Sequence, residues 1–123
     1  MVIVDTSVWV DTMRVPDDRL SGWITADEIL QHPFVTAEIG MGSFRSADDR
    51  FHTIDLLDSF AQIEVADAEA FHAFVAAKAL FGTGIGFADA HLLHSCFARP
   101  AARFATNDKR LLAQARRLGL EAV

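Results

Sequence analysis

Apolar residues recur at two different spacings along the chain, and these divide it into predicted strands and helices. The β-branched run Val2–Val4 is typical of a strand buried on both faces, as at the centre of a parallel sheet. The leucines of 109–118, by contrast, recur at the spacing of one helix face. The whole pattern predicts strands at 2–4, 32–36, 62–65, 103–106 and 120–123, and helices at 7–14, 17–30, 37–44, 48–61, 67–81, 88–98 and 109–118.

Strands that alternate with helices favour one fold class. They predict an α/β domain with a mainly parallel central sheet flanked by helices. The chain has 123 residues, of which 51% are hydrophobic, and this fits a single domain over 1–123 with a well-packed core. We find no internal repeat, linker or low-complexity segment in the sequence.

Charge and composition narrow the classes of function. The formal net charge of −6 is unlike the basic surface of most nucleic-acid binders, unless divalent cations neutralise several of the acids. The single Cys96 excludes an internal disulfide, and no apolar run approaches the roughly 18–20 residues that cross a membrane. Because no signal peptide precedes the first strand, we expect a cytoplasmic protein without a membrane partner.

Four acidic residues are expected near the carboxyl ends of strands or at helix starts. Asp5 ends the first predicted strand, and Glu38 lies just past the second, in the first turn of its helix. Asp108 follows the fourth strand, and Asp89 lies in the first turn of the helix before that strand. Parallel strands end at the same edge of a sheet, where open α/β sheets bind their ligands. The acids at the strand ends are therefore expected to meet there.

Each acid taken singly is explained by helix capping, which stabilises by roughly 0.3–1 kcal/mol. Taken together, the four need another explanation, because two carboxylates about 5 Å apart repel by roughly 3 kcal/mol at an effective dielectric constant near 20. A hard divalent cation such as Mg²⁺ or Mn²⁺ removes this repulsion and keeps water ligands that a phosphate can displace. The pattern thus indicates a metal site.

At this point the chain resembles a known family. Four segments are similar to the acidic motifs of PIN-domain nucleases, specifically the VapC toxins of type II toxin–antitoxin pairs: VDTSVWV, HPFVTAEIGMG, FADAHLL and FATNDKRLL. The resemblance covers essentially the whole chain, and the order and spacing of the acids match it. It implies a PIN-like domain in which Asp5, Glu38, Asp89 and Asp108 are catalytic and bind Mg²⁺ or Mn²⁺, with Ser7 and Thr106 supporting the carboxylates by hydrogen bonds.

The resemblance also implies an activity and partners. The activity is that of a metal-dependent endoribonuclease toxin, in which the cation polarises a phosphoryl oxygen and activates a water for attack on RNA, with tRNA a plausible target. The partners are a cognate antitoxin and a second copy of the chain. Trp9, Trp23 and the ten Phe residues are more than a small domain readily buries, which favours the same apolar contacts.

Several motifs lie outside the four acids. His91 and His94 are not part of the family pattern and are interpreted as surface or packing residues. The stretch GTGIG follows a helix instead of a strand, so we interpret it as a helix stop and connector and not as a phosphate-binding loop. The last helix carries basic residues opposite its leucines, which form either a solvated face or a phosphate-binding group. They are Lys109, Arg110, Arg116 and Arg117.

Two other classes of function stay open at this level. A phosphotransfer domain also ends a strand in an Asp, but a DxD phosphatase needs an acid where Ser7 stands, and the candidate receiver-domain acceptor Asp55 lies in a helical pattern. A non-catalytic binding module with a vestigial acid cluster fits the same residues. A metal titration combined with an RNA cleavage assay separates the three.

Overall fold

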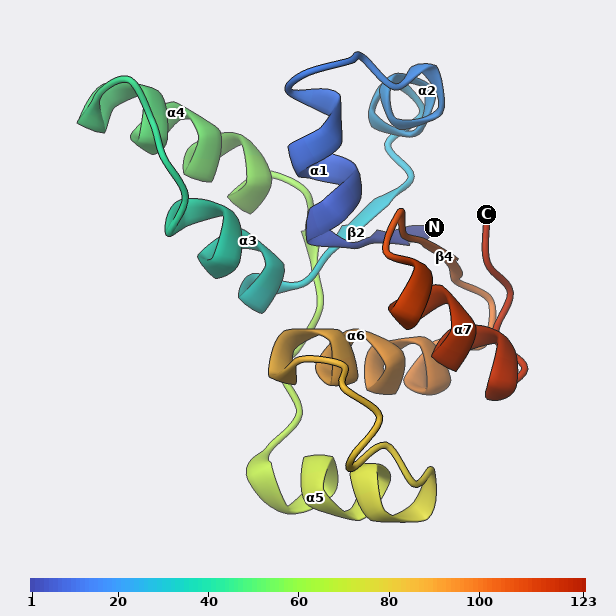
Figure 1. Cartoon of the computed structure of the whole chain (residues 1–123). Coiled ribbons are helices and arrows are strands. Elements are labelled where there is room, and N and C mark those ends of the chain that lie inside the picture. The colour runs from blue at the N-terminus through green and yellow to red at the C-terminus, as the bar shows by residue number, and fades with distance from the viewer.

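The computed structural model describes residues 1–123 and builds them around a four-stranded parallel sheet (Figure 1). The order of the strands across the sheet is β3-β2-β1-β4, so β1 is flanked on both sides. Their bounds are Val2–Val4 for β1, Ile29–Gln31 for β2, Ala61–Gln62 for β3 and Arg103–Ala105 for β4. The predicted α/β class with a parallel sheet is confirmed.

Seven helices surround the strands. They are α1 (Thr6–Thr12), α2 (Asp18–Thr25), α3 (Pro33–Gly40), α4 (Ala47–Asp58), α5 (Ala68–Ala77), α6 (Phe87–Ala98) and α7 (Lys109–Arg117). In Figure 1, α1, α3 and α4 form one packed group, while α5 packs on α6. None of the helices has the length and apolar content that a membrane crossing requires.

The core lies on both faces of β1 and β4. Ile3 and Phe104 are fully buried, because both strands are covered by the apolar faces of helices. Leu92 and Leu93 of α6 and Leu111 of α7 are buried against them. This packing holds the amino-terminal ends of α1, α6 and α7 in fixed positions relative to the sheet.

The strand predicted at 32–36 is wrong. Pro33 occupies the first position of α3, where its missing N–H costs no hydrogen bond, and His32 is the N-cap. The Nδ1 atom of His32 accepts the N–H of Phe34 at 2.9 Å. The strand lies instead at Ile29–Gln31, and Glu38 is therefore in the second turn of α3 and not in the first.

Other boundaries also differ from the predictions, including the strand predicted at 62–65, which is Ala61–Gln62. Leu30 belongs to β2 and not to the preceding helix, which ends at Thr25 before the left-handed residue Asp27. The helix predicted at 67–81 ends at Ala77, and Phe81 beyond it is exposed. The strand predicted at 120–123 is reduced to an isolated bridge between Phe104 and Ala122.

Candidate active site

Asp5 stands at the centre of the candidate site. It follows β1 directly, caps α1, and is 3% exposed. A buried carboxylate needs hydrogen-bond donors, and its Oδ2 atom accepts the Ser7 hydroxyl at 2.6 Å and the Thr106 hydroxyl at 2.8 Å. The Ser7 backbone N–H approaches the same oxygen at 3.4 Å.

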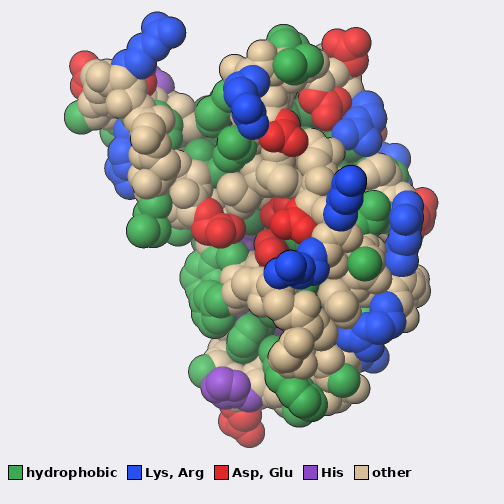
Figure 2. All heavy atoms as spheres, in the orientation of Figure 1, with side chains coloured by type: hydrophobic (Ala, Val, Ile, Leu, Met, Phe, Trp, Pro, Cys, Tyr) green, Lys and Arg blue, Asp and Glu red, His purple; other side chains and the backbone are tan.

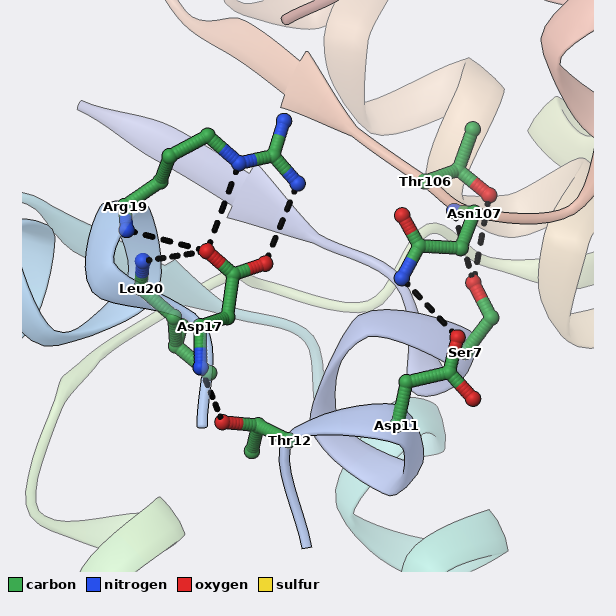
Figure 3. Close-up of polar contacts among 8 residues, drawn as sticks. All are labelled: Ser7, Asp11, Thr12, Asp17, Arg19, Leu20, Thr106 and Asn107. Carbon is green, nitrogen blue, oxygen red and sulfur yellow. Dashed lines mark hydrogen bonds and ion pairs between the residues drawn. The ribbon is translucent and has the colours of Figure 1, made fainter. Parts of the chain in front are cut away.

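The other contacts of the two hydroxyl groups show where their protons point. Ser7 Oγ accepts the backbone N–H of Asn107 at 2.9 Å, and Thr106 Oγ1 accepts the backbone N–H of Asp108 at 3.0 Å. Each hydroxyl has one proton, and both protons point to Asp5. The 3.4 Å approach of the two hydroxyl oxygens, visible in Figure 3, is therefore a contact and not a hydrogen bond. Oδ1 of Asp5 receives no donor from the protein.

Glu38 and Asp108 show the same division between their two oxygens. Oε1 of Glu38 accepts the Thr6 hydroxyl at 2.9 Å. Oδ1 of Asp108 caps α7 by accepting the backbone N–H groups of Arg110 at 2.9 Å and Leu111 at 3.0 Å. In each of these acids one oxygen is held by protein donors and the other has none.

Asp89 lies in the first turn of α6 and is partly buried. The pKa of this carboxyl is raised to about 6, mainly by burial and then, in decreasing order, by the negative charges of Asp5, Glu38 and Asp108. These three acids act on Asp89 because they lie in its neighbourhood. Figure 2 shows acidic side chains gathered in the middle of this face of the molecule.

The four carboxylates suit a hard divalent cation. Carboxylate oxygen is a donor that Mg²⁺ and Mn²⁺ favour, and such a cation removes the repulsion that raises the Asp89 pKa. In this structure, no three of these side chains lie close enough together to hold a metal ion. The oxygens without a protein donor on Asp5, Glu38 and Asp108 are the ones that a cation would engage.

Two supporting residues escaped the sequence analysis. Thr6 begins α1, and its hydroxyl holds Glu38, 32 positions away. The backbone N–H of Asn107 donates to Ser7 Oγ, and its side chain donates to Asp11 Oδ2 at 2.9 Å (Figure 3). A polar residue directly beside each acid was the available signal, but its partner is set by the fold.

His91 and His94 are packing residues. His91 is buried and stacks on Phe71 with ring centroids 3.9 Å apart, while Phe34 and Phe87 meet it edge-on. His94 stacks on Phe74 at 4.6 Å. Neither histidine has a carboxylate partner in the site.

Comparison with known proteins gives the family. The model of the PIN domain matches residues 2–118. Ribonuclease VapC32 of Mycobacterium tuberculosis, in strains CDC 1551/Oshkosh and ATCC 25618/H37Rv, is 38% identical over 113 residues, which are 92% of this chain and 89% of the relative. The chain therefore belongs to the PIN-domain family and, within it, to the VapC ribonucleases.

Two solved structures share the fold. PAE2754 from Pyrobaculum aerophilum superposes with a TM-score of 0.66 at 18% identity, over 92% of this chain and 83% of that one. FitAcB from Neisseria gonorrhoeae gives a TM-score of 0.64 at 15% identity, over 99% of this chain and 96% of that one. At these identities the likeness concerns the fold alone.

Proposed function

We propose that this chain is the toxin of a type II toxin–antitoxin pair, a metal-dependent endoribonuclease that hydrolyses RNA phosphodiester bonds with water as nucleophile. The observation that carries the proposal is the shared arrangement of Asp5, Glu38 and Asp108. Each has one oxygen held by the protein and one without a donor, and all three raise the pKa of Asp89. Membership of the VapC ribonucleases supports RNA as the substrate.

Each residue of the site has a role in this reaction. Asp5, Glu38, Asp89 and Asp108 would hold Mg²⁺ or Mn²⁺, which would polarise a phosphoryl oxygen and lower the pKa of a water ligand. Ser7 and Thr106 orient Asp5, because both donate a hydrogen bond to its Oδ2 atom. Thr6 orients Glu38 in the same way.

One rival function loses support from the geometry. A DxD phosphatase needs a second acid at position 7, whereas Ser7 serves there as a donor to Asp5. The receiver-domain candidate Asp55 lies on the exposed surface of α4, away from the end of any strand. The binding module with a vestigial cluster differs from the proposed enzyme only in activity, so experiment decides between them.

The proposed partners are a cognate antitoxin and a second copy of the chain. Trp9 is buried and stacks on Phe60, so it is not part of a contact surface. Other large apolar side chains are exposed in its place: Met41, Phe51, Phe81 and Phe87. Such residues favour protein contacts, and sedimentation of the isolated chain at micromolar concentration would show the dimer. We also propose an RNA substrate, specifically tRNA, and activity in the cytoplasm.

The decisive experiment combines cleavage with metal binding. The purified chain should cut single-stranded RNA and tRNA in Mg²⁺ or Mn²⁺, stop in EDTA, and bind the metal in a titration. The Asp5→Asn variant should lose both cleavage and most of the metal affinity while keeping its circular dichroism spectrum. RNA binding without cleavage would indicate the vestigial module, and hydrolysis of a phosphomonoester alone would indicate the phosphatase.

A further inference from the structure

A polar cavity lies beside the four acids, where the start of α7 meets the start of α6 and the segment that precedes it. Its volume is about 420 Å³. The residues that line it are Gly84, Ile85, Asp89, Asp108, Lys109 and Arg110. It therefore joins two of the site carboxylates to two basic residues. Figure 2 shows Lys and Arg side chains directly against the central acidic cluster.

Arg110 is held in this cavity by a backbone carbonyl. Its Nη1 atom donates to the carbonyl oxygen of Gly84 at 3.2 Å. Gly84 has a φ of +83°, a conformation that favours glycine, and a Cβ atom there would lie 2.9 Å from Nη1, so Arg110 lies close against this backbone. The glycine-rich stretch, interpreted from sequence as a connector, thus seats the guanidinium of Arg110.

The charge of Arg110 is not neutralised by the nearby carboxylates. The two ion pairs of the structure, Arg19 with Asp17 and Arg103 with Glu28, lie elsewhere. Asp108 accepts the backbone N–H of Arg110 but does not pair with its guanidinium. A guanidinium has five N–H donors, and the Gly84 carbonyl accepts only one of them. The remaining donors are available to an anion that enters the cavity.

We propose that Arg110, assisted by Lys109, binds a backbone phosphate of the RNA next to the phosphate that is cut. This inference rests on the proposed function. A protein with a net charge of −6 needs local cations to hold a polyanion, and these two border the site itself. Arginine matches phosphate with two parallel N–H donors. Because Asp89 and Asp108 line the same cavity as Arg110, a phosphate held by Arg110 would lie beside one held at these two acids.

The other basic residues of α7 are excluded from this role. Arg117 donates to the Lys78 carbonyl at 2.8 Å and to Gln114 Oε1 at 2.7 Å, away from the acids. Arg116 is exposed near the opposite end of the helix and does not line the cavity. Arg116 is therefore a control for Arg110, with the same charge on the same helix.

The test measures RNA binding separately from cleavage. A short fluorescein-labelled single-stranded RNA is titrated in EDTA, by anisotropy at several salt concentrations, with Glu38→Gln as the non-cleaving background. Adding Arg110→Gln should weaken binding by about five- to tenfold at low salt and reduce the slope of log K against log salt by about 0.7. Arg110→Lys should keep most of the slope, and Arg116→Gln should change neither quantity.

Specific results would overturn the inference. Equal affinity and slope for Arg110→Gln and Arg116→Gln would show that Arg110 does not contact RNA. A loss that Arg110→Lys does not restore, together with a lower melting temperature, would show that Arg110 only supports the Gly84 segment. Cleavage by the chain without substitutions in Mg²⁺ tests the proposed function independently. Failure of the inference about Arg110 is therefore distinguished from failure of the proposed function.

Discussion

Thr106 donates a 2.8 Å hydrogen bond to Asp5 Oδ2, although 101 positions separate the two residues in the chain. The same hydroxyl accepts the backbone N–H of Asp108. One side chain thus fixes the turn after β4 against the turn after β1. The relative placement of two of the four carboxylates depends on this contact, because α1 and α7 begin at these turns.

Replacing Thr106 should affect both stability and activity. Thr106→Val keeps the shape but leaves Asp5 with one hydroxyl donor fewer and the Asp108 N–H without its acceptor. We expect a loss of about 2 kcal/mol in the free energy of unfolding and a 10- to 100-fold loss (roughly) in metal affinity or cleavage rate. Thr25→Val on α2, whose hydroxyl bonds only to its own helix, is the control. Equal effects of the two variants would refute the supporting role.

Asp89→Asn should abolish cleavage yet stabilise the metal-free fold. Asp89 is mostly ionised at pH 7, but its raised pKa means that this charge is less stable in the folded chain than in the unfolded chain, and the amide has no such charge. After allowance for solvent screening we expect about 1 kcal/mol of stabilisation, or roughly 4 °C in melting temperature in EDTA. Asp55→Asn, an exposed acid on α4, should leave cleavage unchanged. A destabilised or fully active Asp89→Asn would contradict this assignment.

Metal affinity should decrease as the pH is lowered, because Asp89 becomes protonated. The pKa of its carboxyl is about 6, so the group is mostly ionised at pH 7.5 and mostly protonated at pH 5.5. Because a cation binds the carboxylate, calorimetry should show about fourfold weaker binding at pH 5.5 from this group, with proton release on binding. The Asp89→Asn variant should lack this component. Affinity independent of pH would mean that Asp89 is not a ligand.

His32 should make the protein less stable in acid. It is buried, and burial together with the charges of His91 and Arg99 lowers its pKa to about 4, from 6.5 in the unfolded chain. Below pH 6.5 the unfolded chain binds a proton at His32 more readily than the folded chain does. The free energy of unfolding is therefore unaffected above pH 6.5 and falls as the pH drops toward 4, by about 2–3 kcal/mol at pH 4.5. His32→Asn keeps an N-cap acceptor but does not titrate. Denaturant unfolding at pH 7 and 4.5 should show a smaller drop for this variant than for the unchanged chain.

The cleavage products should carry a 5′-phosphate and a 3′-hydroxyl. Ribonucleases that use the 2′-hydroxyl as nucleophile need a general base and acid around the ribose, commonly histidines, and leave cyclic or 3′-phosphate ends. Here His91 and His94 are stacked on phenylalanines, and the site holds carboxylates. Mass spectrometry of the products decides the matter. A 2′,3′-cyclic phosphate, or cleavage unchanged in EDTA, would show that a metal-activated water is not the nucleophile.

Local signals in the sequence misplaced one segment around the site. Pro33 can begin a strand or occupy the first position of a helix, and residues 29–36 are apolar enough for either. Tertiary pairing decided the outcome, because Ile29 and Leu30 pair with Val2 and Ile3 of β1. As a result, Glu38 lies in the second turn of α3 and not in the first, and there it accepts the Thr6 hydroxyl.

The sequence by itself determined the fold class, the buried strand β1 and the order of the four acids, because apolar periodicity, helix caps and motif spacing are properties of neighbouring residues. Only the tertiary structure decided which oxygen of each acid is held, that His91 is stacked in a cluster of phenylalanines, and that Arg110 shares a cavity with Asp89. The decisive contacts join Thr6 to Glu38 across 32 positions and Arg110 to Gly84 across 26. No spacing along the chain encodes such partners, since they meet only after the helices have packed on the sheet.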